Sequence, residues 1–354
     1  MEDVKATLRE LRSLRFDPPG HAKKGARRTT FQAALEQCEQ FLAAAGDAGY
    51  ATRPVQLFYA LSQACRAVVA ASPRIGNQQW NVHGHGLRAR TSSTSVADTT
   101  VAASESGLFQ SVATALQVEA LAPDDVVSLR ELWPLLPEMA GVALPGNFST
   151  PALLFMPSNW PNPGPFSQAE LHWIPTQVRE RYGHDRTRVG DFLKQYPALH
   201  NCEITRHGIT AERVKWIEHP LGLSLDVEWR SNDSPVRVFE SQSTRNLGLV
   251  PYCGPDDWYV TPPLGQMRQG LHPFLALWAT LLALSSLARY EPAPWSRMID
   301  IDRSAEANAL EHLLDKAAES ISRSVLNVLT LSTAEGRPSV AAGGSPSDDE
   351  HPRG

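Results

Sequence analysis

Two histidines and two arginines lie close together in one short segment of the chain. His83 and His85 flank Gly84, and Arg88 and Arg90 follow. An imidazole titrates near neutral pH and can transfer protons, while an arginine binds phosphate oxygens through its paired N–H donors. These residue types predict a phosphate bound by Arg88, Arg90 and His83, with His85 placed for acid-base chemistry.

Two more arginines lie in helices that we expect to approach His85. Arg66 belongs to a predicted helix over residues 54–71, and Arg289 ends one over residues 273–289. If these helices pack together, Arg66 and Arg289 join His85 as catalytic residues. The simpler interpretation is structural: the histidines satisfy backbone carbonyls in a glycine-containing turn, and Arg289 interacts with the helix dipole.

Metal and cofactor chemistry have less support in the sequence. Two imidazoles would need a third ligand, and none lies nearby, so we predict no metal site. The chain contains no P-loop, GxGxxG or GxSxG motif, and we therefore expect no bound cofactor and no serine nucleophile.

The composition is that of an ordinary soluble protein. The 354 residues are 42% hydrophobic and 20% charged, with a formal net charge of -5, so any basic site must be local. The cysteines are widely scattered and the N-terminus is charged, which favours a reducing, cytoplasmic setting. The most apolar run, residues 274–287, is shorter than the ~20 residues that span a bilayer. We expect a buried core helix and no membrane partner.

Helical periodicity appears at both ends of the chain. Apolar residues recur at steps of three and four, which predicts amphipathic helices over residues 31–45, 54–71, 273–289 and 304–331. The fold class that follows is α+β: one helical bundle, built from residues 29–95 and 264–331, interrupted by an insertion.

The insertion, residues 96–263, has mixed α/β character. Strict alternation over residues 223–230 predicts a strand, with residues 236–240 as its hairpin partner. Outside the bundle, residues 1–28 are predicted to be a basic flexible arm, and residues 332–354 a disordered tail with too few apolar residues to form a core.

Tryptophans and arginines gather in the insertion. Arginines alternate with other residues over 179–188, and several tryptophans, including Trp173 and Trp258, lie on either side of them. Aromatic rings beside cations are typical of single-stranded nucleic-acid binding. The alternative is that these aromatic residues belong to the core.

Three sets of residues carry a family resemblance: Arg53-Pro54-Val55-Gln56-Leu57-Phe58-Tyr59, then His85-Gly86-Leu87-Arg88-Ala89-Arg90 with Gly107-Leu108-Phe109, and last Leu284-Ser285-Ser286-Leu287-Ala288-Arg289-Tyr290-Glu291-Pro292 with Trp295. In these residues the sequence resembles the YaaC-like family of bacterial proteins. This family has no settled activity, so the resemblance implies a fold without implying a reaction.

A weaker resemblance is to HEPN helical bundles, many of which are metal-independent ribonucleases of toxin and antiphage systems. They place an arginine and a histidine about four to six residues apart near the end of a helix. Arg74 with His83 or His85 is the nearest fit in the bundle, at a longer spacing, while Arg179 and His184 have the spacing but lie in the insertion.

Two functions therefore remain open. The first is a cytoplasmic interaction or accessory protein that recognises a phosphate-bearing partner, a nucleotide or nucleic acid, in stress or antiphage defence. It would act with a protein partner or as a homo-oligomer. The alternative is a HEPN-like metal-independent ribonuclease.

Overall fold

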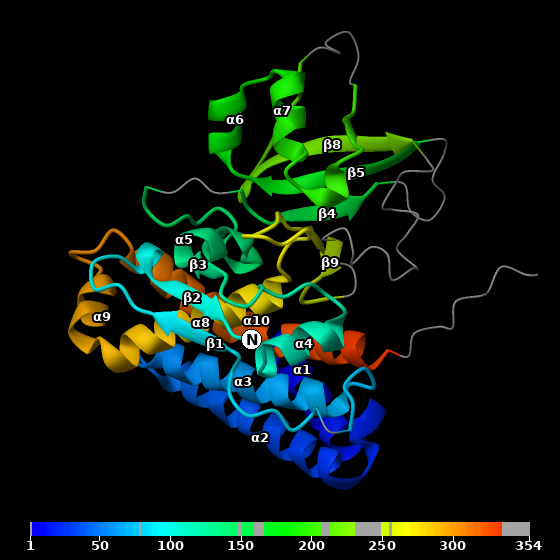
Figure 1. The fold of residues 1–354 in the computed structure, drawn as a ribbon. Helices are drawn as coiled ribbons and strands as arrows, with labels where there is room; N and C mark the ends of the chain where they lie inside the picture. Colours follow the sequence, from blue (N-terminus) through cyan, green and yellow to red (C-terminus); the bar gives the residue numbers. More distant parts are fainter. Residues whose placement is uncertain are drawn as a thin grey trace, which may run out of the picture.

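The computed structural model describes residues 2–77, 79–146, 150–158, 166–206, 213–230, 249–254 and 257–334. In this part of the chain the protein is α+β, as the sequence predicts. A helical layer lies on one side and a sheet layer on the other (Figure 1). The helices of the first layer are α1 (Glu2–Phe16), α2 (Gly25–Asp47), α3 (Arg53–Ala71), α4 (Leu108–Leu116), α5 (Leu129–Leu132), α8 (Pro273–Tyr290), α9 (Pro292–Met298) and α10 (Ala307–Thr333).

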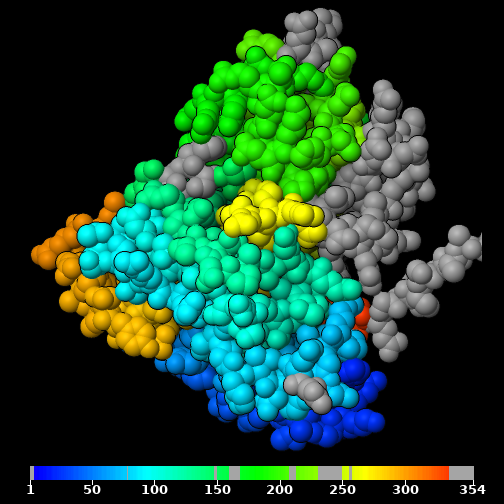
Figure 2. Space-filling view, viewed as in Figure 1, coloured from blue at the N-terminus to red at the C-terminus, as the bar shows by residue number. Residues whose placement is uncertain are grey.

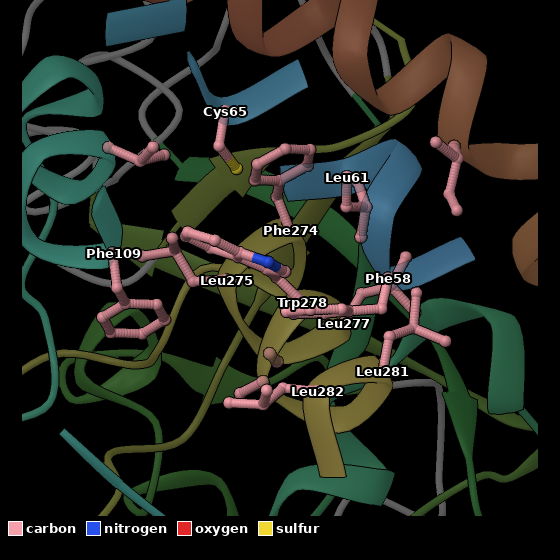
Figure 3. Packing of buried hydrophobic residues seen from close by; sticks show 14 of the residues in the cluster. Phe58, Leu61, Cys65, Phe109, Phe274, Leu275, Leu277, Trp278, Leu281 and Leu282 are labelled. Carbon is pink, nitrogen blue, oxygen red and sulfur yellow. The ribbon is translucent and has the colours of Figure 1, made fainter. Parts of the chain in front are cut away.

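Two helices from opposite ends of the chain, α3 and α8, form the centre of the helical layer. Helix α3 contacts α2, α4, α8 and α10, and every residue of α8 from Pro273 to Leu287 is buried. The Trp278 ring lies between apolar side chains of both helices and of α4 (Figure 3), and its indole N–H donates to Ser62 Oγ at 3.2 Å. This packing confirms the predicted core helix.

Helix α8 is also the one described helix that is long and apolar enough to span a membrane. In the structure 83% of that span is buried within the protein. A core helix passes the same test of length and composition, so the test alone is weak evidence for a membrane.

Two antiparallel sheets complete the fold. The smaller has the order β1 (Leu87–Arg90), β2 (Thr100–Ala103), β3 (Val126–Ser128). The larger has the order β6-β8-β5-β4-β10-β9, and β7 also pairs with β8. Its strands are β4 (Leu153–Pro157), β5 (Phe166–Ile174), β6 (Glu203–Ile204), β7 (Ile217–His219), β8 (Gly222–Arg230), β9 (Leu249–Pro251) and β10 (Trp258–Val260). The sheet layer also contains the helices α6 (Thr176–Tyr182) and α7 (Arg186–Leu193).

Short 3₁₀ turns link these elements and tighten their ends. They are η1 (Gly20–Lys23), η2 (Val96–Asp98), η3 (Trp133–Leu135), η4 (Pro137–Met139) and η5 (Pro197–Leu199). In Figure 2 the larger sheet rests on the helical layer, with the yellow segment that precedes α8 between them.

The two layers have separate hydrophobic cores, and the boundary between them differs from the predicted one. The composition predicts an insertion that begins at residue 96, but Val101, Phe109 and Leu132 are buried in the helical core. The second core draws its buried residues from Leu153 to Val260. A bundle of terminal helices plus one insertion is therefore not confirmed, because β2, β3, α4 and α5 pack with the helices and not with the larger sheet.

The N-terminal segment also differs from the predicted flexible arm. Residues 2–16 form α1, with Leu11 buried against the helical core. On its outer side Arg12 pairs with Glu39, and Arg15 pairs with Glu36 at 2.9 Å. These arginines thus have acidic partners on α2, while apolar residues of α1 pack against the helical core.

Two predictions lie outside the described residues. The hairpin partner at residues 236–240 is one, and residues 335–354 of the predicted tail are the other. The strand at residues 223–230 is confirmed as β8, which pairs with β5, β6 and β7.

Candidate functional site

His85 lies in the loop between α3 and β1, at the surface of the helical core. Its side chain is half-buried, and the edge of its ring meets Phe58 of α3 with 4.9 Å between the ring centroids. A rigid aromatic residue on one side fixes where the imidazole lies.

The backbone around His85 is held by the first turn of α4. The Gly84 carbonyl accepts from Leu108 N–H at 3.2 Å, and the His85 carbonyl accepts from Phe109 N–H at 2.9 Å. The first N–H groups of a helix have no partner within the helix, so this loop satisfies them as a cap does. The loop and α4 therefore order each other.

Two glycines allow this close approach. Gly86 and Gly107 both have positive φ angles, +76° and +141°, and a Cβ on Gly107 would stand 2.3 Å from Gly86 Cα. The Gln110 side chain bridges the same junction by donating to Ser104 O at 2.5 Å and to Gly86 O at 3.3 Å. The two family-like segments around His85 and Gly107 are thus one structural unit.

Two arginines approach His85 from the two central helices. Arg66 of α3 donates to Val82 O at 3.2 Å. Arg289, in the last turn of α8, donates to Ser285 O at 3.1 Å and lies 3.5 Å from the Tyr59 hydroxyl. Helix α3 and helix α8 thus bring Arg66 and Arg289 together with His85, as the sequence predicts they would if the helices pack side by side.

The charges around His85 disfavour its protonated form. Burial lowers its pKa most, and the positive charges of Arg66 and Arg289 lower it further. Its Nδ1 atom is inaccessible to solvent and has no hydrogen-bond partner among the described residues. This nitrogen of His85 therefore satisfies no carbonyl among the described residues.

The two arginines have no acidic partner among the residues that the structure describes. Among the ion pairs of the described residues none involves Arg66 or Arg289. Both are half-buried, so their charges are less screened than those of exposed side chains. Two partly buried cations thus act on an imidazole whose pKa they lower.

The other predicted site residues lie at the edge of this region. Arg88 and Arg90 are exposed on the same face of β1, opposite Ala102 and Thr100 of β2 in the strand register. His83 is exposed in the loop before it. No ion pair of the described residues involves Arg88 or Arg90, so both are available to a long anion such as a nucleic-acid backbone.

Tyr59 is a site residue that the sequence reasoning missed. Its ring stacks on Phe41, with 5.5 Å between centroids, and the Arg289 guanidinium lies 6.0 Å from its centroid. The signal was present in the spacing, because Tyr59, Ser62 and Arg66 follow one another at steps of three and four and so share one face of α3. These three polar residues form a stripe beside the apolar face of α3.

Metal and thiol chemistry find little support in the described residues. No three His, Cys, Asp or Glu side chains within them approach closely enough to hold a metal ion. Cys38 and Cys65 are fully buried, and burial raises the pKa of both thiols. A thiol of raised pKa is a poor nucleophile near neutral pH.

With this geometry established, comparison with known proteins identifies the class. The profile of the YaaC-like protein family matches residues 5–329, nearly the whole chain. The protein therefore belongs to the YaaC-like family. No significant match was found among curated proteins or among solved structures.

Proposed function

We propose that this YaaC-like protein is an interaction or accessory protein that binds a phosphate-bearing partner, a nucleotide or nucleic acid, at His85, Arg66 and Arg289. The observation that carries the proposal is the pair of half-buried arginines without acidic partners beside a histidine whose pKa they lower. A phosphate group would neutralise both cations and accept several charge-assisted hydrogen bonds. Arg88, Arg90 and His83 would extend the contact along a nucleic-acid backbone.

The setting we propose is the bacterial cytoplasm, in a stress or antiphage response, with a protein partner or a second copy of the chain and with no membrane. Helix α8 then serves as the centre of the fold. The link to defence follows only from the HEPN analogy of fold.

The test measures binding of two defined probes, ATP and a fluorescein-labelled single-stranded RNA, by calorimetry and fluorescence anisotropy. We expect Arg66→Gln to weaken binding of the preferred probe by about tenfold, the value of one charge-assisted hydrogen bond. Arg297→Gln is the matched control, because Arg297 is an exposed arginine on α9. Equal binding by both variants, or no binding of either probe to the wild type, would refute the proposal.

A second function, a metal-independent ribonuclease, is favoured by the state of His85. A lowered pKa leaves its imidazole uncharged near neutral pH, which is the form that accepts a proton. In such a reaction the imidazole would take the proton of a ribose 2′-hydroxyl, whose oxygen attacks phosphorus while the bond from phosphorus to the 5′-oxygen breaks. The leaving 5′-oxygen would take up a proton from water, and the imidazolium would release its own proton to solvent. The products would be a 2′,3′-cyclic phosphate and a 5′-hydroxyl, and Arg66 and Arg289 would stabilise the charge that develops.

This second function predicts cleavage of the RNA probe in excess EDTA. His85→Gln should abolish cleavage without changing the circular dichroism spectrum, while His200→Gln, at an exposed position outside the candidate site, should retain it. Persistent cleavage by His85→Gln would exclude this histidine as the base. Intact RNA after long incubation with the wild type would leave binding as the function of the site.

A further inference from the structure

A cavity of about 280 Å³ lies between the helical core and the larger sheet. Its walls on the helical side come from the segment after α5, with Trp133, Leu136 and Met139. On the sheet side they come from the end of β5, with Trp173, and from the turn between β7 and β8, with Leu221. Junctions between two cores are common places for small-molecule sites.

The described lining of this cavity disfavours a charged ligand. None of the described residues that line it is Asp, Glu, Lys or Arg. Its polar side chains, Thr176, Gln177 and His219, are all exposed, while Trp133 and Leu136 are buried. An ion that entered would lose hydration without gaining a counter-charge. A ligand that fits has an apolar body and at most a polar edge directed outward.

The wall at Trp173 is held in a strained backbone conformation. Trp173 has φ +67°, which is rare for a bulky side chain and costs on the order of 1–3 kcal/mol. It lies where the pairing of β5 with β8 shifts register, between Leu171 and Ile174. Such a bulge re-aims a side chain, and bulges are frequent beside binding sites. Here it contributes to a wall that also contains the second tryptophan, Trp133.

The turn between β7 and β8 forms the rim of the cavity. Leu221 is 46% exposed although it is a large apolar residue. Gly222, which follows it, has φ +136°, and a Cβ there would stand 2.6 Å from Ile174 O. The turn is therefore pressed against β5 by a contact that only glycine permits, and Leu221 is held at the opening.

We propose that this cavity binds a small, uncharged aromatic molecule, with one or two fused rings, between the two layers. Two tryptophans and several aliphatic side chains match a flat apolar ring system, and a volume slightly below the ~300 Å³ at the lower end of drug-sized pockets limits its size. The site is independent of His85, Arg66 and Arg289, and its test does not depend on the proposed phosphate binding.

The experiment titrates the full chain with indole, and in parallel with indole-3-carboxylate, by calorimetry and saturation-transfer NMR. Indole is expected to bind at one site, and the carboxylate at least about tenfold more weakly because its charge finds no partner. Leu221→Arg and Thr176→Arg, which place a cation at the rim, should each weaken indole binding by about tenfold or more.

Ile301→Arg is the control, because Ile301 is 58% exposed and does not line the cavity. It should bind indole as the wild type does. Absence of indole binding, equal binding of the carboxylate, or binding unchanged in both rim variants would overturn the proposal. All three altered positions are exposed, so thermal unfolding is expected to remain close to that of the wild type.

Discussion

Two basic regions of this protein differ in how their charges are compensated. The segment from α6 to α7 is the denser of the two in sequence, with arginines at 179, 181, 186 and 188. The region around His85 draws its arginines from two helices that are far apart in the chain. The number of arginines in the sequence suggests the first region as an anion site, whereas we propose the second.

The α6–α7 segment uses its arginines within the fold. Arg179 pairs with Glu218 at 2.8 Å, and Arg188 donates to Arg181 O at 2.8 Å. Arg186 lies near the positive charge of Arg206 as well as near Glu203 and Glu228. The acids of this segment, Glu218 above all, offset part of its positive charge.

The region around His85 has the opposite character. Arg66 and Arg289 donate to carbonyl or hydroxyl oxygens and to no carboxylate among the described residues. Their charges act on a half-buried imidazole, where solvent screens them less. The comparison teaches that the partners and the burial of an arginine, and not the number of arginines nearby, decide how strongly its charge acts on its surroundings.

The largest effect should come from the glycine junction that holds His85. Gly107→Ala is expected to lower the free energy of unfolding by about 3 kcal/mol, because its Cβ would stand 2.3 Å from Gly86 Cα at a φ of +141°. Urea denaturation followed by circular dichroism measures the loss. Phosphate binding should weaken in the same variant.

Gly84→Ala separates backbone strain from the steric clash. Gly84 also has a positive φ, +82°, but a Cβ there meets nothing within 4 Å. The expected loss is about 1–2 kcal/mol, the cost of a left-handed conformation alone. Equal losses in the two variants would mean that the contact with Gly86 does not hold the loop.

The elements of the helical layer were largely predictable from the sequence, whereas the layer boundary was not. Apolar spacing is a local property, so α3 and α8 appear at nearly the predicted residues. Which core a short segment joins is decided by contacts between distant residues. Helix α4 packs on α3, and no local pattern in its nine residues distinguishes that core from the other.

The candidate site was predictable in its members but not in its environment. His85, Arg66 and Arg289 followed from residue type and an assumed packing of helices. The buried Nδ1 atom of His85 and the missing acidic partners depend on all the elements that surround the loop. Neither feature can be predicted from the sequence of a single segment.

The second-largest effect is expected when the arginines of the two basic regions are replaced and the binding of the variants is compared. Replacing Arg66 and Arg289 together by Gln should weaken binding of the labelled RNA or ATP by about 30-fold, or about 2 kcal/mol, and flatten its salt dependence. Replacing Arg179 and Arg188 together removes the same charge. It should change binding by less than about twofold, because Arg179 is paired with Glu218 and Arg188 is exposed to solvent, which screens its charge. The reverse order of effects would assign the site to the α6–α7 segment.

The third effect concerns pH and follows from the lowered pKa of His85. Because the folded pKa lies below the ordinary value of 6.5, the unfolded chain binds the proton first as the pH falls. Stability contributed by His85 is therefore present above pH 6.5 and is lost as the pH falls from there through the folded pKa.

Urea denaturation between pH 7.5 and 5 measures this loss. His85→Phe, which keeps a ring against Phe58, should show a shallower decline than the wild type, while His83→Gln should not. Added phosphate should bind more tightly as the pH falls, since a bound anion favours the imidazolium. Identical pH profiles for the wild type and His85→Phe would contradict the position of His85 between two cations.

The smallest effect is expected at the ion pair of the α6–α7 segment. Arg179→Gln removes a partner of Glu218, but these side chains are 33% and 74% exposed, and exposed pairs contribute about 0.5 kcal/mol. The double variant with Glu218→Gln should be as stable as either single variant to within the same amount, which a thermodynamic cycle of urea denaturations measures. A coupling several times larger would mean that this pair is part of the structural frame of the sheet layer. In that case the fold itself would require Glu218 beside Arg179. The two basic regions would then differ in what their arginines contribute to stability, and not only in whether they bind an anion.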